Sequence, residues 1–397
     1  MLKSLQWLYN LVSLIFIGNI LLYATPIHAQ TVSDLYQATI PVSSNTVAER
    51  DIAIKQALTA VLLKVSGEPT VIKNVALQAQ LKNPAVLVEQ YTYQSVANTN
   101  GGVSANLFLK VNFNANKVKQ LILKNGFSIW GVNRPTVLIW LTTKDQTGEH
   151  FLTAETQAAA ITVMQEQAQQ RGLPIILPLL DMVDLNTLSL NDINEVNKVA
   201  LNAALKRYGA DATAILQLQQ STTQSFEGVW TLIVQNEVQS WPVQAEQIEQ
   251  ILQQGIDSIS NILAKRYGTH AQNTEEAPVI LKITQVGSAA AYQQSLAYLK
   301  SLAAVKNVQV IKLDENAVFF QIDLLGSRQN FLEGLSLNKQ WIPLQSEDMV
   351  PHFGEEESRS PGALPVPIIN HNLYQEGPAV PAHPSAQTVD YVYQWAG

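Results

Sequence analysis

Residues 135–141 read Pro-Thr-Val-Leu-Ile-Trp-Leu, and this stretch decides the fold class. After Thr136 every residue is apolar, with no alternation of polar and apolar side chains. A strand of this kind is covered on both faces, as strands of α/β sheets are, because helices pack on both sides of the sheet. We therefore predict an α/β middle module in a chain of mixed α/β and α+β modules, with mixed sheets and helices packed on them.

The middle module extends from about Arg134 to Gly268. The elements predicted around the first strand are a helix over Thr153 to Arg171, a buried strand over Pro174 to Leu180, a helix from Asp192 to Tyr208 with a capping box to Glu195, and antiparallel strands over 213–218, 229–234 and 238–243. Two helices end alike, in Lys206-Arg-Tyr-Gly209 and Lys265-Arg-Tyr-Gly268. The favoured interpretation is C-capping, with cations at the negative helix end before a glycine able to take positive φ. The alternative is a binding motif, which is disfavoured because no phosphate-binding type of loop surrounds either copy.

The first module, residues 31–131, is predicted to be α+β. Its strand over Leu35 to Val42 precedes a helix that opens with the capping-box pattern Thr46-x-x-Glu49 and stops at Gly67. The apolar side chains that share one face of this helix are Ile54, Leu58, Val61, Leu62 and Val65. A short helix near 71–81, strands over 88–96 and 103–113, and a helix over 115–123 follow.

A third module, residues 279–344, has the predicted order β-α-β-β-α-β, which is the ferredoxin-like arrangement. From residue 346 to 397 the chain is rich in proline, and we predict a disordered tail. Its last stretch, Val389 to Trp395, is aromatic and has two readings, a docking peptide or a merely ragged end.

Residues 1–29 have the layout of a secretory signal peptide. Lys3 supplies the positive start, residues 11–24 the apolar stretch, and Ala29 the small residue at the expected cleavage site. An uncleaved signal anchor is the alternative, because Trp7, Leu8 and Tyr9 lengthen the apolar segment. We expect a periplasmic location in a Gram-negative envelope or, with an anchor, an inner-membrane protein facing the periplasm.

Composition removes several classes of partner and site. The chain has no cysteine, which excludes disulfides, thiolate metal sites and a lipoprotein anchor. Its net charge is −7, charged residues make up 14%, and it has no Lys/Arg run, so we expect no nucleic-acid partner and no anionic lipid face. We expect contact with the membrane only through the possible signal anchor.

Signatures of known chemistry are absent. The sequence has no G-x-S-x-G, no phosphate-binding loop, no dinucleotide fingerprint and no H-E-x-x-H, and no two histidines have helical metal-ligand spacing. We therefore expect no cofactor and no metal, and name no catalytic residue.

Asp181 and Asp184 form the one candidate site for a ligand or metal. They follow the predicted strand over Pro174 to Leu180, and ligands of open α/β sheets bind beyond the carboxyl ends of strands. Two acids there have the chemistry to hold a hard cation or to act as an acid and base pair. The favoured interpretation is that they cap and turn the chain, because no histidine and no third acid lies nearby.

Four further residues are candidates for structural or interaction roles. Arg50 stands in the first turn of the first helix, where a cation is poorly placed, and is expected to pair with Glu49 or Asp51 or to anchor another segment. Arg207, Tyr208 and Gly209 form the helix ending described above.

The residues resemble a family of proteobacterial envelope proteins, domain-of-unknown-function family 2066 (DUF2066). The motifs that carry the resemblance are Leu35-Tyr36 with Pro41-Val42, Ala48-x-Arg50 and the helix through Val65-Ser66-Gly67, Arg134-Pro135 with Leu138-x-Trp140, Gly172-Leu173-Pro174 with Pro178-Leu179-Leu180-Asp181-x-x-Asp184, and Arg207-Tyr208-Gly209-Ala210-Asp211. They lie in the first two modules, and the third matches more weakly. The resemblance implies an envelope location and no established activity.

From these observations we predict that the chain is a non-enzymatic exported protein. It is expected to bind, or to help assemble, an unidentified envelope protein or cell-wall component. One alternative is a metal-dependent hydrolase centred on Asp181 and Asp184. Another is a membrane-tethered structural protein that keeps its signal segment.

Overall fold

The computed structural model describes residue 32 and residues 34–96, 106–221, 225–271, 277–344 and 389–396. These fall into two compact units. The first comprises residues 1–274, 301–304 and 325–339, and the second comprises residues 275–300, 305–324 and 340–397. The signal segment lies outside the described residues. No helix in the described part of the chain is long and apolar enough to span a membrane.

The N-terminal part of the first unit is an α+β fold, as predicted. Its elements are β1 (Gln37–Val42), α2 (Val47–Ser66), the 3-10 helix η1 (Pro69–Lys73), α3 (Val75–Gln80), the 3-10 helix η2 (Pro84–Leu87), β2 (Val88–Val96), β3 (Asn106–Phe113) and α4 (Ala115–Lys124). The strands form an antiparallel sheet in the order β1-β3-β2. The predicted apolar face of α2 is fully buried, and Gly67 ends the helix in the left-handed conformation with φ 70°.

The predicted capping box at the start of α2 is wrong. The Thr46 side chain makes no capping hydrogen bond. Glu49 instead reaches back to Ser43, whose backbone N–H and hydroxyl donate to its carboxylate at 3.2 and 3.3 Å. The acid therefore fixes the loop before the helix, and the local pattern alone did not distinguish these two partners.

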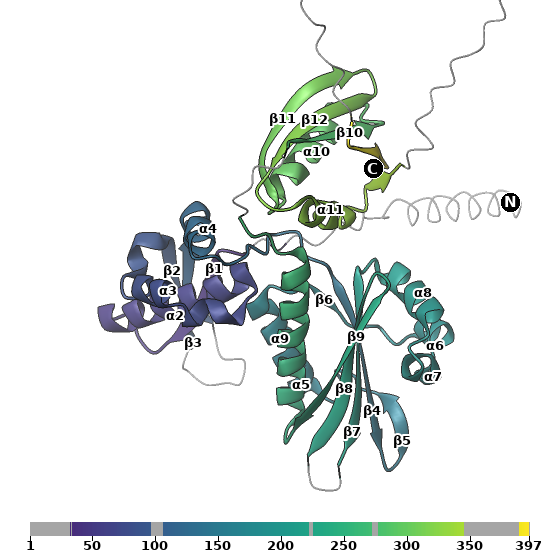
Figure 1. Cartoon of the computed structure of the whole chain (residues 1–397). Helices are drawn as coiled ribbons and strands as arrows, with labels where there is room; N and C mark the ends of the chain where they lie inside the picture. The colour runs from purple at the N-terminus through teal and green to yellow at the C-terminus, as the bar shows by residue number, and fades with distance from the viewer. Residues whose placement is uncertain are drawn as a thin grey trace, which may run out of the picture. The chain divides into compact units, whose positions relative to one another are not determined.

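The middle of the chain forms a six-stranded mixed sheet between helices (Figure 1). Its elements are β4 (Val137–Asp145), β5 (Gly148–Phe151), α5 (Ala158–Arg171), β6 (Ile175–Ile176), α6 (Met182–Thr187), α7 (Leu190–Asn194), α8 (Lys198–Tyr208), β7 (Ala212–Gln220), β8 (Phe226–Val234), β9 (Glu237–Ala245) and α9 (Ile248–Tyr267). The order is β5-β4-β7-β8-β9, with β6 parallel to β4. Helices α5 and α9 cover one face, and α7 and α8 cover part of the other. Strand β4 is buried from Val137 to Thr143, which confirms the opening prediction.

The second buried strand of this module is largely absent. Of the run Pro174 to Leu180, only Ile175 and Ile176 pair with β4. Pro174 and Pro178 lack the N–H that a central strand must donate, so the ladder cannot continue. The chain leaves the sheet here, and Leu179 becomes exposed.

The helix predicted from Asp192 to Tyr208 is two helices. The capping box belongs to Ser189 and Asp192, at the start of α7. Val196 has φ 52° and breaks the helix, and Asn197 caps the start of α8. The common ending also differs: Gly209 is left-handed, with φ 58°, whereas Gly268 has φ −73°.

Arg134 joins the N-terminal and middle parts of the first unit. Its buried guanidinium donates to five backbone carbonyls at 2.7 to 3.0 Å, those of Lys64, Trp130, Gly131, Arg171 and Gly172. It also lies 3.9 Å from the centroid of the Trp130 ring. Arg171 adds a second link by donating to the Gly67 carbonyl at 3.0 Å.

The C-terminal elements have the predicted order β-α-β-β-α-β, followed by one more strand. They are β10 (Val279–Thr284), α10 (Ala289–Ser301), β11 (Val305–Asp314), β12 (Ala317–Leu324), α11 (Arg328–Ser336), β13 (Trp341–Pro343) and β14 (Tyr391–Trp395). The sheet order is β11-β12-β10-β14-β13. Residues 325–339, which contain α11, group with the first compact unit.

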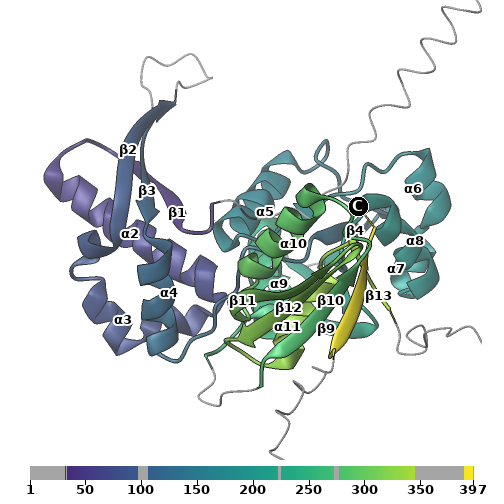
Figure 2. The same cartoon turned by 90° about the horizontal axis from the view of Figure 1, so that it is seen from above.

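Strand β14 corrects the prediction of a wholly disordered tail. Residues 391–395 lie between β10 and β13, parallel to β10 and antiparallel to β13 (Figure 2, yellow strand). Their alternating aromatic side chains suit a half-buried strand, a pattern that the proline-rich composition around them obscured. Residues 346–388 of the predicted tail lie outside the described residues.

Candidate functional site

The candidate acids lie in a short segment between β6 and α7. Asp181 is the N-cap of α6, and its Oδ1 accepts from the backbone N–H groups of Val183 and Asp184, both at 3.0 Å. Leu180, just before the cap, has φ 54°, a left-handed conformation that is costly for a leucine. The prediction that Asp181 caps and turns the chain is confirmed.

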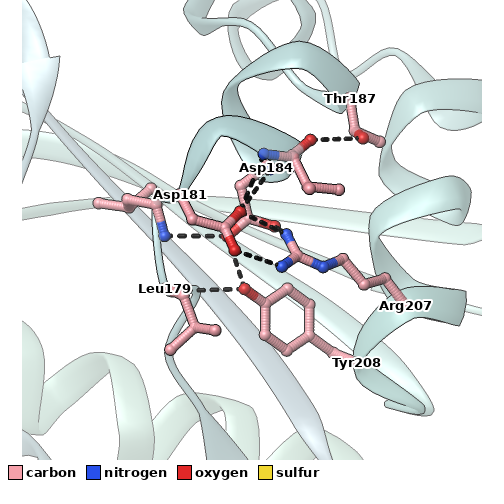
Figure 3. Close-up of polar contacts among 8 residues, drawn as sticks. Leu179, Asp181, Asp184, Thr187, Arg207 and Tyr208 are labelled. Atoms are coloured by element: carbon pink, nitrogen blue, oxygen red, sulfur yellow. Dashed lines mark hydrogen bonds and ion pairs between the residues drawn. The ribbon is translucent and has the colours of Figure 1, made fainter. Parts of the chain in front are cut away.

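Arg207, in the last turn of α8, holds both acids (Figure 3). Its two terminal nitrogens donate to the two oxygens of Asp181, at 2.9 and 2.6 Å. The nitrogen that contacts Asp181 Oδ1 also donates to Asp184 Oδ1. Bidentate pairing of this kind fixes geometry as well as adding energy, because the planar fork matches the carboxylate.

Asp184 is almost fully buried, at 1% exposed, and each of its oxygens has a donor. Oδ1 accepts from Arg207, and Oδ2 accepts from the Tyr208 hydroxyl at 2.5 Å and from the Leu180 N–H at 2.9 Å. The Tyr208 hydroxyl in turn accepts from the Leu179 N–H at 2.8 Å. We call Asp181, Asp184, Arg207 and Tyr208 the acid–arginine network.

Asp181 and Arg207 keep their charges at neutral pH. Hydrogen bonding to Arg207 lowers the pKa of Asp181 to about 2, and the hydrogen bond to Asp181 raises the pKa of Arg207. Burial, together with the hydrogen bond to Asp184, raises the pKa of Tyr208. A general acid or base works best with a pKa near the operating pH, and these shifts move Asp181 and Tyr208 away from it.

The arrangement offers little to a metal. In the described part of the chain, no group of three or more His, Asp or Glu side chains could hold a metal ion. The oxygens of Asp184 are already used, and those of Asp181 face Arg207, whose positive charge repels a cation. These contacts favour the structural interpretation of the two acids over the hydrolytic one.

The same segment presents large apolar side chains to solvent. Leu179, Met182, Val183 and Leu185 are 74%, 72%, 55% and 47% exposed. We call these four residues the apolar patch. Singly exposed apolar residues are common on protein surfaces, whereas here four of them lie within seven residues of the chain.

The other candidates lie elsewhere or act structurally. Arg50 pairs with Asp51 at 3.1 Å and lies 5.7 Å from the centroid of the Tyr91 ring, so one of its two predicted acid partners is confirmed. Gly209 follows the network as the left-handed end of α8, and its carbonyl accepts from Lys339.

The second copy of the helix ending also binds acids. Arg266, in the last turn of α9, pairs with Glu237 at 2.9 Å and with Glu333 at 3.1 Å. In both copies the arginine thus holds two carboxylates from outside its own helix. The shared Lys-Arg-Tyr-Gly sequence did not indicate these carboxylate partners, because each carboxylate lies more than one helix length away from its arginine along the chain.

A shallow hollow of about 750 Å³ lies where α7 and α8 leave the sheet open. Its lining mixes polar side chains of both charge signs, such as Lys144 and Glu227, with the apolar residues Leu218, Val229, Pro242 and Val243. Because the hollow is open to solvent and its charged side chains are of both signs, it does not indicate one class of ligand.

Comparisons with known proteins give families without an established activity. Residues 280–345 match the family model DUF2066, and residues 29–131 match a model described as a domain of unknown function, DUF8605. The DUF2066 resemblance is thus confirmed, but in the third module. The motifs of the first module lie in the DUF8605 match, and those of the middle module lie outside both ranges.

No curated protein matches the chain. One solved structure, titled "Crystal structure of uncharacterized protein", is 11% identical and covers 33% of this chain and 97% of its own, with a TM-score of 0.15. That likeness is too weak to bear on fold or function.

Proposed function

We propose that this chain is an exported, non-enzymatic protein that binds a protein of the cell envelope through its apolar patch. The observation that carries the proposal is the exposure of Leu179, Met182, Val183 and Leu185 on one short segment. Burying such side chains against a partner contributes about 25 cal/mol per Å² of apolar surface removed from water.

The acid–arginine network supports this role by holding the segment in one conformation. Asp184 ties Leu180, Arg207 and Tyr208 together from a buried position. A segment that is already ordered loses less conformational entropy when a partner binds. The strained backbone of Leu180 is consistent with a display function, since strain is kept where the surroundings over-determine it.

The composition of the patch favours a protein over a lipid surface. It contains leucine, valine and methionine but no aromatic residue, whereas helices that lie in the membrane interface combine Trp or Phe with a basic face. Methionine adapts to irregular protein surfaces. The net charge of −7 also disfavours anionic lipids.

The experiment is crosslinking in cells with an epitope-tagged chain, followed by identification of the captured protein. We expect Leu179→Ser combined with Met182→Ser to abolish capture, because both side chains are exposed and neither substitution touches the buried core. The matched control is Val199→Ser, which removes an apolar side chain that is 81% exposed on α8, outside the patch. Equal capture by both variants would contradict the proposal.

A further inference from the structure

Strand β14 occupies a position that a β-α-β-β-α-β fold does not need. In that arrangement the last strand pairs directly with the first, but here β14 separates β13 from β10. β14 pairs with β10 from Leu281↔Tyr391 to Thr284↔Gln394, and with β13 from Trp341↔Trp395 to Pro343↔Tyr393. Within the described residues, β13 pairs with β14 and with no other strand. The sheet therefore contains a slot one strand wide, between β10 and β13.

The slot recognises its occupant through backbone and side chains. The Asp390 carboxylate accepts from the Ile280 N–H at 2.7 Å, and the Asp390 N–H donates to the Ile280 carbonyl at 2.9 Å. At the other end the Ala396 N–H donates to the Gln340 carbonyl at 2.8 Å. These bonds fix the direction and register of the strand.

Aromatic side chains fill one face of the slot. The Tyr393 ring lies 6.1 Å from that of Trp341, which itself lies 5.3 Å from Tyr298 of α10. Trp395 is buried opposite Trp341 in the register. Aromatic pairs across strands contribute beyond the area that they bury, so the pattern Tyr-x-Tyr-x-Trp is what the slot selects.

The connection to β14 is far longer than pairing within one chain requires. Two adjacent antiparallel strands are commonly joined by about two to five residues, whereas residues 344–390 separate β13 from β14. An extended chain covers about 3.3 Å per residue, so this segment is long enough to carry β14 to a neighbouring molecule.

We propose that the slot between β10 and β13 is a strand-binding site and that the C-terminal strand of a second copy of this chain occupies it by exchange. The strand makes the same contacts in either molecule. The ratio of exchanged dimer to monomer therefore depends on the concentration of the protein. Joining two binding partners in one chain gives an effective concentration on the order of 1 mM. Exchange therefore becomes measurable near that concentration, or wherever copies are held together in the envelope. The slot is separate from the apolar patch.

The test uses disulfide trapping in the full chain, which has no cysteine of its own. Ile342 and Gln394 are register partners on β13 and β14, and Ile342 is 48% exposed. Partners of this kind lie about 5.5 Å apart between Cα atoms, a separation that a disulfide spans. An Ile342→Cys chain is mixed with a Gln394→Cys chain of different mass and oxidised, so that exchange gives a covalent heterodimer.

The matched control replaces Ile342→Cys with Leu313→Cys, which lies on β11 and is 67% exposed, so it measures chance collisions. We expect at least tenfold more heterodimer from the Ile342→Cys mixture, rising with concentration up to about 1 mM. Adding Tyr393→Ala to the Gln394→Cys chain should reduce the yield. A heterodimer yield equal to that of the control, with an intramolecular disulfide in the Ile342→Cys/Gln394→Cys double variant, would overturn the proposal.

Discussion

Arg207 contacts both oxygens of Asp181, at 2.9 and 2.6 Å, across a sequence separation of 26 residues. This contact joins the end of α8 to the start of α6 and holds the segment that carries the apolar patch. Asp181 and Asp184 thus hold this segment in place. The exposed side chains beside them form the surface that we propose for a partner.

Arg207→Ala should lower the free energy of unfolding by clearly more than an exposed substitution does, because it leaves the buried Asp184 carboxylate without its cation. Denaturant titration measures the change. Lys206→Ala, the exposed neighbour in the same helical turn, is the control and should change stability by less than about 0.5 kcal/mol. A similar small loss in both variants would show that the network contributes little to the fold.

Acid should weaken the same network. The pKa of Asp181 is about 2 in the folded chain, below the ordinary value of 3.8, so its ionised form is stabilised by folding. That stabilisation is complete above about pH 5 and is lost as the pH falls through 3.8 toward 2. The stability difference between the native chain and Asp181→Asn, measured by denaturation at each pH, should shrink over this range. A difference that stays constant from pH 6 to pH 2 would contradict the assignment.

Arg134→Met should destabilise the first unit by at least about 3 kcal/mol, because five buried carbonyls lose their donor. Burial lowers the pKa of Arg134, yet the carbonyl acceptors favour the charged guanidinium. Arg134→Lys keeps the charge but reaches fewer carbonyls, so its loss should be intermediate. Guanidinium denaturation distinguishes the two, and equal stability of all three chains would remove Arg134 as the link.

Cleavage of the signal segment is a separate expectation. Export with cleavage after Ala29 gives a mature chain that starts at Gln30. Intact-mass measurement on the native protein checks this directly. A mass that includes residues 1–29 would favour the anchored alternative.

Local patterns predicted much of the fold. The unbroken apolar run of β4, the one-sided face of α2 and the β-α-β-β-α-β order all follow from periodicity, which reflects burial along a single element. The prediction for Pro174 to Leu180 was wrong because apolar content outweighed two prolines that cannot donate to a ladder.

Contacts between distant segments were beyond prediction. Asp181 and Asp184 were recognised from their position after a predicted strand, and Arg207 was a separate candidate for a structural or interaction role at a helix end. Their pairing was not predicted, because nothing in a single sequence pairs residues so far apart. Strand β14 pairs with β10 across more than a hundred residues. The apolar patch was missed for the opposite reason: its residues were assigned to a buried strand and its flank, so their exposure was not foreseen.

Site-specific photocrosslinking in cells tests whether the apolar patch binds an envelope protein. A photoreactive residue at Met182 should capture one defined protein, whereas the same residue at Val199, which is even more exposed but lies on α8 outside the patch, should capture none. Capture of the same proteins from both positions, or from neither, would contradict the account.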